Sequence, residues 1–287
     1  MKIKWVLVLC FALPLFSGRV FAQTNQTFAA RGIVQQISTD RRTATIQHEA
    51  IPGYMAAMTM DFSVNATNEL SGISPNDEIT FTLAVTENES WIENIHFVSH
   101  HVGQVTNHVF VFHADAPELK VGDRLPDGEL TTEAGSLIRF SDFHGRAVAF
   151  TFFFTSCPLP EFCPRMNRNF SEARKILLAD TNAPANWQFL SISFDTHFDT
   201  PEILSGYGKY YRGDDTNRWL FTVATTNTLA ELSPAVDLHF WRENGSISHN
   251  LRTVVLDASG KIFRQFDGND WTPQQLADAI AEAARNQ

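Results

Sequence analysis

One continuous segment, residues 146–179, constrains the fold of this chain most strongly. It begins with RAVAFTFFFTS, a run of apolar residues typical of a strand that is buried on both faces of a sheet. A short loop that contains Cys157 and Cys163 follows, and in the next stretch, RMNRNFSEARKILLA, apolar residues recur with helical spacing. A buried strand that passes directly into a helix predicts an α/β sheet in this part of the chain.

The sequence after residue 179 continues the same pattern. A second apolar strand is followed by a helical stretch, then by a pair of strands and a closing helix; these are WQFLSISFD, TPEILSGYGKYY, RTVVLDASGKIFRQF and TPQQLADAIAEAARN. Strands that alternate with helices and end in a hairpin and a helix predict an α/β thioredoxin-like domain.

The first hundred residues have a different pattern. From residue 31 to 98, apolar and polar residues alternate in TATIQH, MTMDFSV and EITFTLAV, and the turn sequences STDRR, SPND and TENES separate them. Short strands of this kind predict a small all-β, OB-like barrel. Because 287 residues exceed the usual size of one domain, we expect two.

The two predicted domains are joined by a histidine-containing connector, residues 101–116. Five histidines occur in and just around it, at positions 96, 100, 101, 108 and 113. Their spacing fits no standard ligand pattern, so a polar linker is the favoured interpretation and an adventitious metal site is the alternative.

The first 22 residues have the features of a secretory signal peptide. Lys2 and Lys4 precede a short apolar run, and Val20 and Ala22 offer small residues for cleavage. Export to the periplasm or beyond is therefore expected, with no membrane span in the mature chain. Cleavage would lower the net charge from −10 to about −13, which disfavours binding to nucleic acid.

Cleavage would also remove Cys10 and leave two cysteines, Cys157 and Cys163. Both lie where a strand ends and a helix begins, a position where backbone N–H groups favour a thiolate. A redox couple, a metal site and a structural disulfide are all compatible with the pair. A disulfide across so short a loop would contribute about 2 kcal/mol, so energy alone does not exclude the structural role.

Three stretches, FTFFFTSCPLPEFCPRM, SFDTHFDTPEIL and ISHNLRTVVLDASGKI, resemble the SCO/SenC family of copper proteins, and the resemblance extends over residues 117–287. It implies a thioredoxin-like fold that binds copper through Cys157, Cys163 and His249. His197 is the best substitute for His249, whereas His239 is expected to be a packed or surface residue. The family loop has three residues between its cysteines, and this chain has five.

The chemistry of the implied ligands agrees with copper. Two thiolates and an imidazole suit Cu(I) and can also hold Cu(II), whereas oxidation to a disulfide would release the metal. The resemblance implies a copper metallochaperone whose acceptor is a protein such as a subunit of cytochrome c oxidase. The alternatives are a thiol–disulfide oxidoreductase that acts on such an acceptor, so that enzymatic activity stays open, and a copper buffer.

Asp195 and Asp199 match acidic positions of the SCO/SenC motif. A helix-capping role for Asp199 or Thr200 is the simpler alternative.

A second set of candidate ligands lies in the predicted barrel, in HEAIPGYMAAMTMDF. Met58, Met60 and Phe62 share one strand face, so filling the barrel core is one interpretation. The stretch also resembles the CusF-type copper-binding domain, which implies residues 23–100 as such a domain with His48, Met58 and Met60 as ligands of Cu(I). The tryptophan of that pattern is absent, and Met55 stands near its place as a further candidate ligand.

Overall fold

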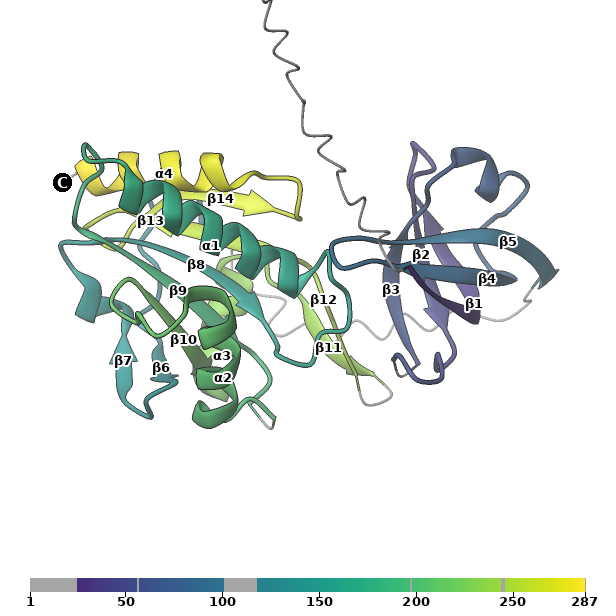
Figure 1. Cartoon of the computed structure of the whole chain (residues 1–287), viewed down its shortest axis with the longest axis horizontal. Helices are drawn as coiled ribbons and strands as arrows, with labels where there is room; N and C mark the ends of the chain where they lie inside the picture. Colours follow the sequence, from purple (N-terminus) through teal and green to yellow (C-terminus); the bar gives the residue numbers. More distant parts are fainter. Residues whose placement is uncertain (1–24, 56, 101–117, 197, 244–245, 287) are drawn as a thin grey trace, which may run out of the picture.

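The computed structural model describes residues 25–286, except for residues 56, 101–117, 197 and 244–245. The described residues form two large sheets, one in the N-terminal and one in the C-terminal part of the chain, and a small two-stranded sheet (Figure 1). We call the described residues 25–100 the first domain and 118–286 the second domain. The predicted signal peptide and most of the predicted connector lie outside the described residues.

The first domain is a five-stranded antiparallel sheet in the order β3-β2-β1-β4-β5. The strands are β1 (Gln26–Ile37), β2 (Thr43–His48), β3 (Met58–Ser63), β4 (Asp77–Val85) and β5 (Ser90–His100), with a short 3₁₀ helix, η1 (Thr67–Leu70). Alternate residues of β2, β3 and β4 are buried, as the period-two pattern predicts. Within the described residues, Val64, which follows β3, forms an isolated bridge with Ile92 of β5, and no ladder joins β3 to β5. The sheet is therefore not closed into a barrel by continuous hydrogen bonding.

The second domain is a seven-stranded mixed sheet in the order β14-β13-β8-β9-β10-β6-β7. Its strands are β6 (Glu129–Thr132), β7 (Leu137–Arg139), β8 (Ala147–Phe153), β9 (Trp187–Ser193), β10 (Trp219–Ala224), β13 (Arg252–Leu256) and β14 (Ile262–Asp267). Its helices are η2 (Phe140–Phe143), α1 (Cys163–Ala179), α2 (Pro201–Arg212), α3 (Thr226–Ala235) and α4 (Pro273–Arg285). Every residue of β8 and β9 is buried, because these central parallel strands are covered on both faces. The predicted thioredoxin-like arrangement is thus confirmed.

A small hairpin, β11 (Phe240–Glu243) and β12 (Ser246–His249), stands apart from the seven-stranded sheet. The sequence did not lead us to expect it. The hairpin extends toward the first domain, as does the loop between β8 and α1 (Figure 1). The Ser248 hydroxyl of β12 donates a hydrogen bond of 2.6 Å to the carbonyl oxygen of Thr59 in β3, which joins the two domains.

No helix among the described residues combines the length and the apolar character needed to cross a bilayer.

Candidate metal centre

The two cysteines lie on the β8–α1 loop at different depths. Cys157 is half-buried in the loop, whereas Cys163 is the first residue of α1 and is fully buried. Pro164 follows in the first turn, where its missing N–H costs the helix nothing. Both cysteines are free thiols, so the structure represents the reduced state.

His249, the last residue of β12, approaches Cys163. Its Nδ1 lies 2.8 Å from the Asn250 carbonyl oxygen, which can only accept a hydrogen bond, so Nδ1 carries the proton. Nε2 therefore has a lone pair, and the Cys163 sulfur lies 3.4 Å from it. Edge-on contacts with Phe154 and Phe194, at ring-centroid distances of 5.7 and 4.8 Å, fix the orientation of the imidazole.

The surroundings set the protonation of these three groups. Burial lowers the pKa of His249 to about 4, so the imidazole is neutral at physiological pH and able to bind a metal. Burial raises the pKa of the Cys163 thiol well above its ordinary value. Burial opposes ionisation of Cys157 too, but hydrogen bonding from Cys163 and from the loop backbone outweighs it and lowers the pKa of Cys157. Cys157 is consequently the sulfur that ionises first.

The three side chains are near one another without forming a finished metal site. Within the described part of the chain, no three His, Cys, Asp or Glu side chains are gathered closely enough to hold a metal ion. The Cys157 sulfur lies beside that of Cys163 and also 4.0 Å from the Leu159 carbonyl oxygen.

The other sequence candidates around this centre have different positions. His239 is an exposed side chain that pairs with Asp237 at 2.7 Å, in agreement with the predicted surface role. His197 lies outside the described residues. Thr200, not Asp199, caps α2, by accepting a hydrogen bond from the Ile203 amide.

Asp199 is instead buried beneath the cysteine loop. Its carboxylate accepts hydrogen bonds from the Thr155 amide at 3.0 Å, from the Thr155 hydroxyl and from the Ser193 hydroxyl. Asp199 thereby fixes the backbone two residues before Cys157. Asp195 accepts a hydrogen bond from the amide of Phe198 at 3.2 Å within its own turn.

The candidate ligands of the first domain lie together in its core. His48 of β2 is directly opposite Met58 of β3, and Met60 follows on the same face opposite Ile46. His48, Met55, Met58 and Met60 are all at most 8% exposed. The Nδ1 atom of His48 donates to the Glu49 carbonyl oxygen at 2.7 Å, which leaves Nε2 with its lone pair. The methionines fill the core, as the simpler interpretation expects, and they also present sulfur beside an imidazole.

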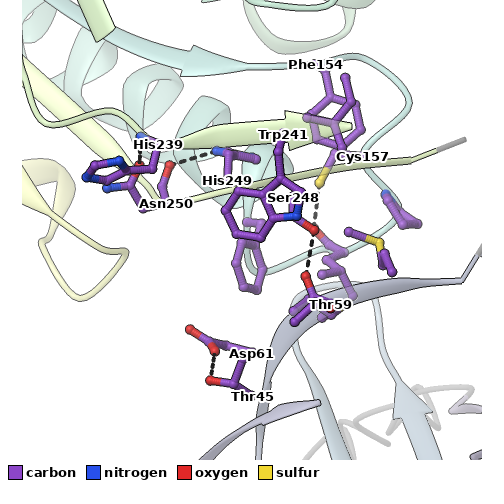
Figure 2. A pocket seen from close by; sticks show the side chains of 16 residues that line it. Thr45, Thr59, Asp61, Phe154, Cys157, His239, Trp241, Ser248, His249 and Asn250 are labelled. Carbon is purple, nitrogen blue, oxygen red and sulfur yellow. Dashed lines mark hydrogen bonds between the residues drawn. The ribbon is translucent and has the colours of Figure 1, made fainter. Parts of the chain in front are cut away.

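A cavity of about 180 Å³ at the junction of the domains connects the two sets of candidate ligands (Figure 2). Met58 and Met60 line it from the first domain, and Cys157 and His249 line it from the second. Trp241 of the unpredicted hairpin also lines it. Sequence reasoning missed this residue because nothing in the sequence around it indicated that its hairpin faces the other domain.

Comparison with known proteins agrees with this architecture. The family model for SCO1/SenC matches residues 124–285, more than half of the chain. The chain belongs to the SCO1/SenC family. The model for the copper binding periplasmic protein CusF matches residues 27–96. The predicted membership and the CusF-like first domain are therefore confirmed.

Several solved structures are similar to a little more than half of the chain. A putative electron transfer protein from Aquifex aeolicus VF5 has 22% identity and a TM-score of 0.51, covering 58% of this chain and 96% of that chain. A SCO1/SenC family lipoprotein from Bacillus anthracis has 23% identity and a TM-score of 0.51, covering 58% and 98%. Arabidopsis thaliana ScoI, solved with copper bound, has 15% identity and a TM-score of 0.48, covering 56% and 98%. None of the curated proteins compared with the chain matches it significantly.

Proposed function

We propose that this protein is an exported copper carrier that captures Cu(I) in its first domain and passes copper from its second domain to an acceptor protein. The observation that carries the proposal is the cavity at the domain junction, where thioethers of one domain and a thiol and an imidazole of the other meet. Thioether, thiolate and imidazole are the donors that Cu(I) prefers in proteins.

The two ligand sets have different roles in this proposal. His48, Met55, Met58 and Met60 take up Cu(I) from a dilute supply, because thioethers need no deprotonation before they bind a metal. Cys157, Cys163 and His249 hold copper for delivery. In that set His249 offers a neutral nitrogen, and Cys157 is the first sulfur to bind because its thiol ionises more readily than that of Cys163.

The acceptor we propose is a copper-binding subunit of cytochrome c oxidase. One Sco protein in the structural comparison is described as a member of a family of cytochrome c oxidase assembly proteins. Export is supported by the predicted signal peptide and by the match to a periplasmic copper-binding protein.

A thiol–disulfide oxidoreductase is the second candidate. The low pKa of Cys157 beside the high pKa of Cys163 resembles the attacking and resolving thiols of a redox pair. A disulfide-exchange rate that survives His249→Ala would favour this function, because exchange takes place between sulfur atoms, whereas the proposed copper site includes the imidazole.

The proposed function is tested by Cu(I) retention under reducing conditions against bicinchoninate. We expect the full chain to retain copper and the variant Met58→Leu/Met60→Leu/Cys157→Ser/Cys163→Ser to lose it. Met166→Leu is a matched control, since Met166 is also a buried methionine but does not line the cavity. Retention by the fourfold variant equal to that of the wild type would contradict a copper-carrying role for these residues.

A further inference from the structure

We propose that Cys157, Met58 and Met60 together form a third Cu(I) site, which spans the two domains and through which copper passes from the first ligand set to the second. This inference rests on the proposed function and adds the route of transfer. Neither domain contains all three of these ligands, so the site forms only when the two domains are docked.

The first argument is the set of residues that line the cavity. Met58 and Met60 of the first domain border the same cavity as Cys157 of the second, beside Ser248 and Thr59 (Figure 2). One thiolate and two thioethers make a three-coordinate sulfur set, which is well suited to Cu(I).

The second argument is the character of the cavity wall. Apolar side chains make up much of it, among them Phe154, Leu159, Phe162 and Ile247. A Cu(I) ion bound to one thiolate and two neutral thioethers has no net charge. Such a complex can lie in an apolar space without the cost of burying an unpaired charge.

The third argument is the loop between the cysteines, whose residues contact the first domain directly. Tyr54 donates a hydrogen bond of 2.7 Å to the Pro158 carbonyl oxygen, and the Ser90 hydroxyl bonds the buried Glu161 carboxylate. Leu159 is 4% exposed and packs within the hydrophobic core of the first domain. The five-residue spacing thus provides the residues that bring Cys157 against the methionine strand.

The second domain also holds this loop in place, through hydrogen bonds to two of its carbonyl oxygens. Arg168 donates to the Pro160 carbonyl oxygen at 2.7 Å, and Asn269 donates to the Glu161 carbonyl oxygen at 3.0 Å. Beside the loop, Ser248 binds the carbonyl of Thr59, the residue between Met58 and Met60. This hydrogen bond holds the strand that ends at His249 against the strand that carries Met58 and Met60. The ligands that would receive copper therefore lie close to those that would release it.

The transfer is an exchange of ligands without a change in oxidation state. When Cu(I) bound to Met58 and Met60 meets Cys157, the thiol releases one proton to solvent and a Cu–S bond forms. Bonds to the Cys163 sulfur and His249 Nε2 then form as the two thioether bonds break, and the Cys163 proton also goes to solvent. No electron donor or acceptor is required.

The test is the affinity for a single Cu(I) per full-length chain, measured by competition with bicinchoninate under anaerobic reducing conditions. The variants are Met58→Leu, Cys157→Ser and the double variant, with Met166→Leu as control. For a shared site, each single variant loses about tenfold or more in affinity, because copper then keeps only the ligand set of one domain. The double variant, which removes a ligand from every set, loses more than either single one.

Independent sites give a different result. If the two domains bind copper separately, the association constant for the first copper ion is the sum of the constants of the two sites. Removal of the weaker site then leaves at least about half of that constant. One of the two single variants must therefore bind the first copper ion nearly as tightly as the wild type. That outcome overturns the inference but leaves the proposed function intact. A wild-type chain that binds no Cu(I) would instead overturn the proposed function.

A docking variant tests the geometry without changing any ligand. Tyr54→Phe removes the hydroxyl that holds Pro158, and Tyr210→Phe is the matched control because Tyr210 is 78% exposed on α2. We expect Tyr54→Phe to weaken binding of the first copper ion and Tyr210→Phe to leave it unchanged. Equal affinities for the two variants would contradict a site that depends on docking of this loop.

A spectroscopic measurement shows whether the methionine and cysteine side chains bind Cu(I) directly. In a selenomethionine-labelled chain, X-ray absorption at the copper edge separates selenium neighbours, which come from methionine, from sulfur neighbours, which come from cysteine. With one Cu(I) per chain we expect both, and Cys157→Ser removes the sulfur contribution while selenium remains. Copper with selenium neighbours alone in the wild type would overturn the inference.

Discussion

The two candidate histidines are positioned alike, although they lie in different domains. Each is the last residue of a strand, and each donates its Nδ1 proton to the carbonyl oxygen of the following residue, Glu49 for His48 and Asn250 for His249. Each therefore presents a lone pair on Nε2. The difference is in the sulfur atoms beside them, which are thioethers in the first domain and thiols in the second.

This difference separates two kinds of copper ligand. A thioether has no proton to lose and forms no disulfide, so the first set keeps its donors under conditions that oxidise only thiols. A pair of thiols binds copper only when reduced. The first domain is thus suited to holding copper continuously, and the second is suited to holding it conditionally.

Oxidation should give the largest effect and separate the two sets completely. A mild disulfide oxidant such as oxidised glutathione should join Cys157 to Cys163 and remove their copper, while copper at Met58 and Met60 stays bound. Copper per chain, measured after desalting, gives the result. Loss of all copper on such treatment would show that the first set does not hold the metal without the cysteines.

Acid should destabilise the copper-free protein through the partly buried imidazole of His249. The folded-state pKa of His249 is about 4, below the ordinary 6.5, so the unfolded state binds this proton first as the pH falls. Stability from His249 is therefore complete above about pH 6.5 and is lost between 6.5 and 4, by about 3 kcal/mol in all. Urea denaturation at several pH values should show a shallower acid loss for His249→Gln, and identical slopes would contradict this account.

Asp199→Asn should give a smaller effect, confined to the second set. Asparagine has one acceptor oxygen where the carboxylate has two, so part of the anchoring of Thr155 and Ser193 is lost, at a cost of about 1–3 kcal/mol in the free energy of unfolding. Copper binding through Cys157 should weaken while the first set is unaffected. Asp278→Asn, on the exposed side of α4, is the matched control; an equal loss there would remove the special role of Asp199.

The sequence predicted those parts of the fold that have a strong local pattern. The apolar run of β8, the helical spacing of α1 and the alternation in β3 each show which face is buried, and the structure agrees. The β11–β12 hairpin was missed because it pairs with itself outside the main sheet, and its short strands have no sustained alternation.

The contacts that build the candidate site were less accessible to sequence reasoning. Asp199 binds Thr155 across 44 positions of the chain, and Ser248 binds Thr59 across 189. The local hydrophobic pattern of a sequence cannot predict hydrogen-bond partners that are so far apart along the chain. The ligand types could be identified from the sequence, but their meeting at one cavity depends on how the two domains dock.

Leu159 has a further consequence for how the molecule folds. It belongs to the second domain in sequence but to the core of the first domain in space, where burial of such a side chain is worth about 2 kcal/mol. The two domains therefore share part of their folding free energy, and unfolding one should lower the melting temperature of the other. A loop shortened to three residues would weaken this coupling and leave the contact between Ser248 and Thr59 as a remaining link.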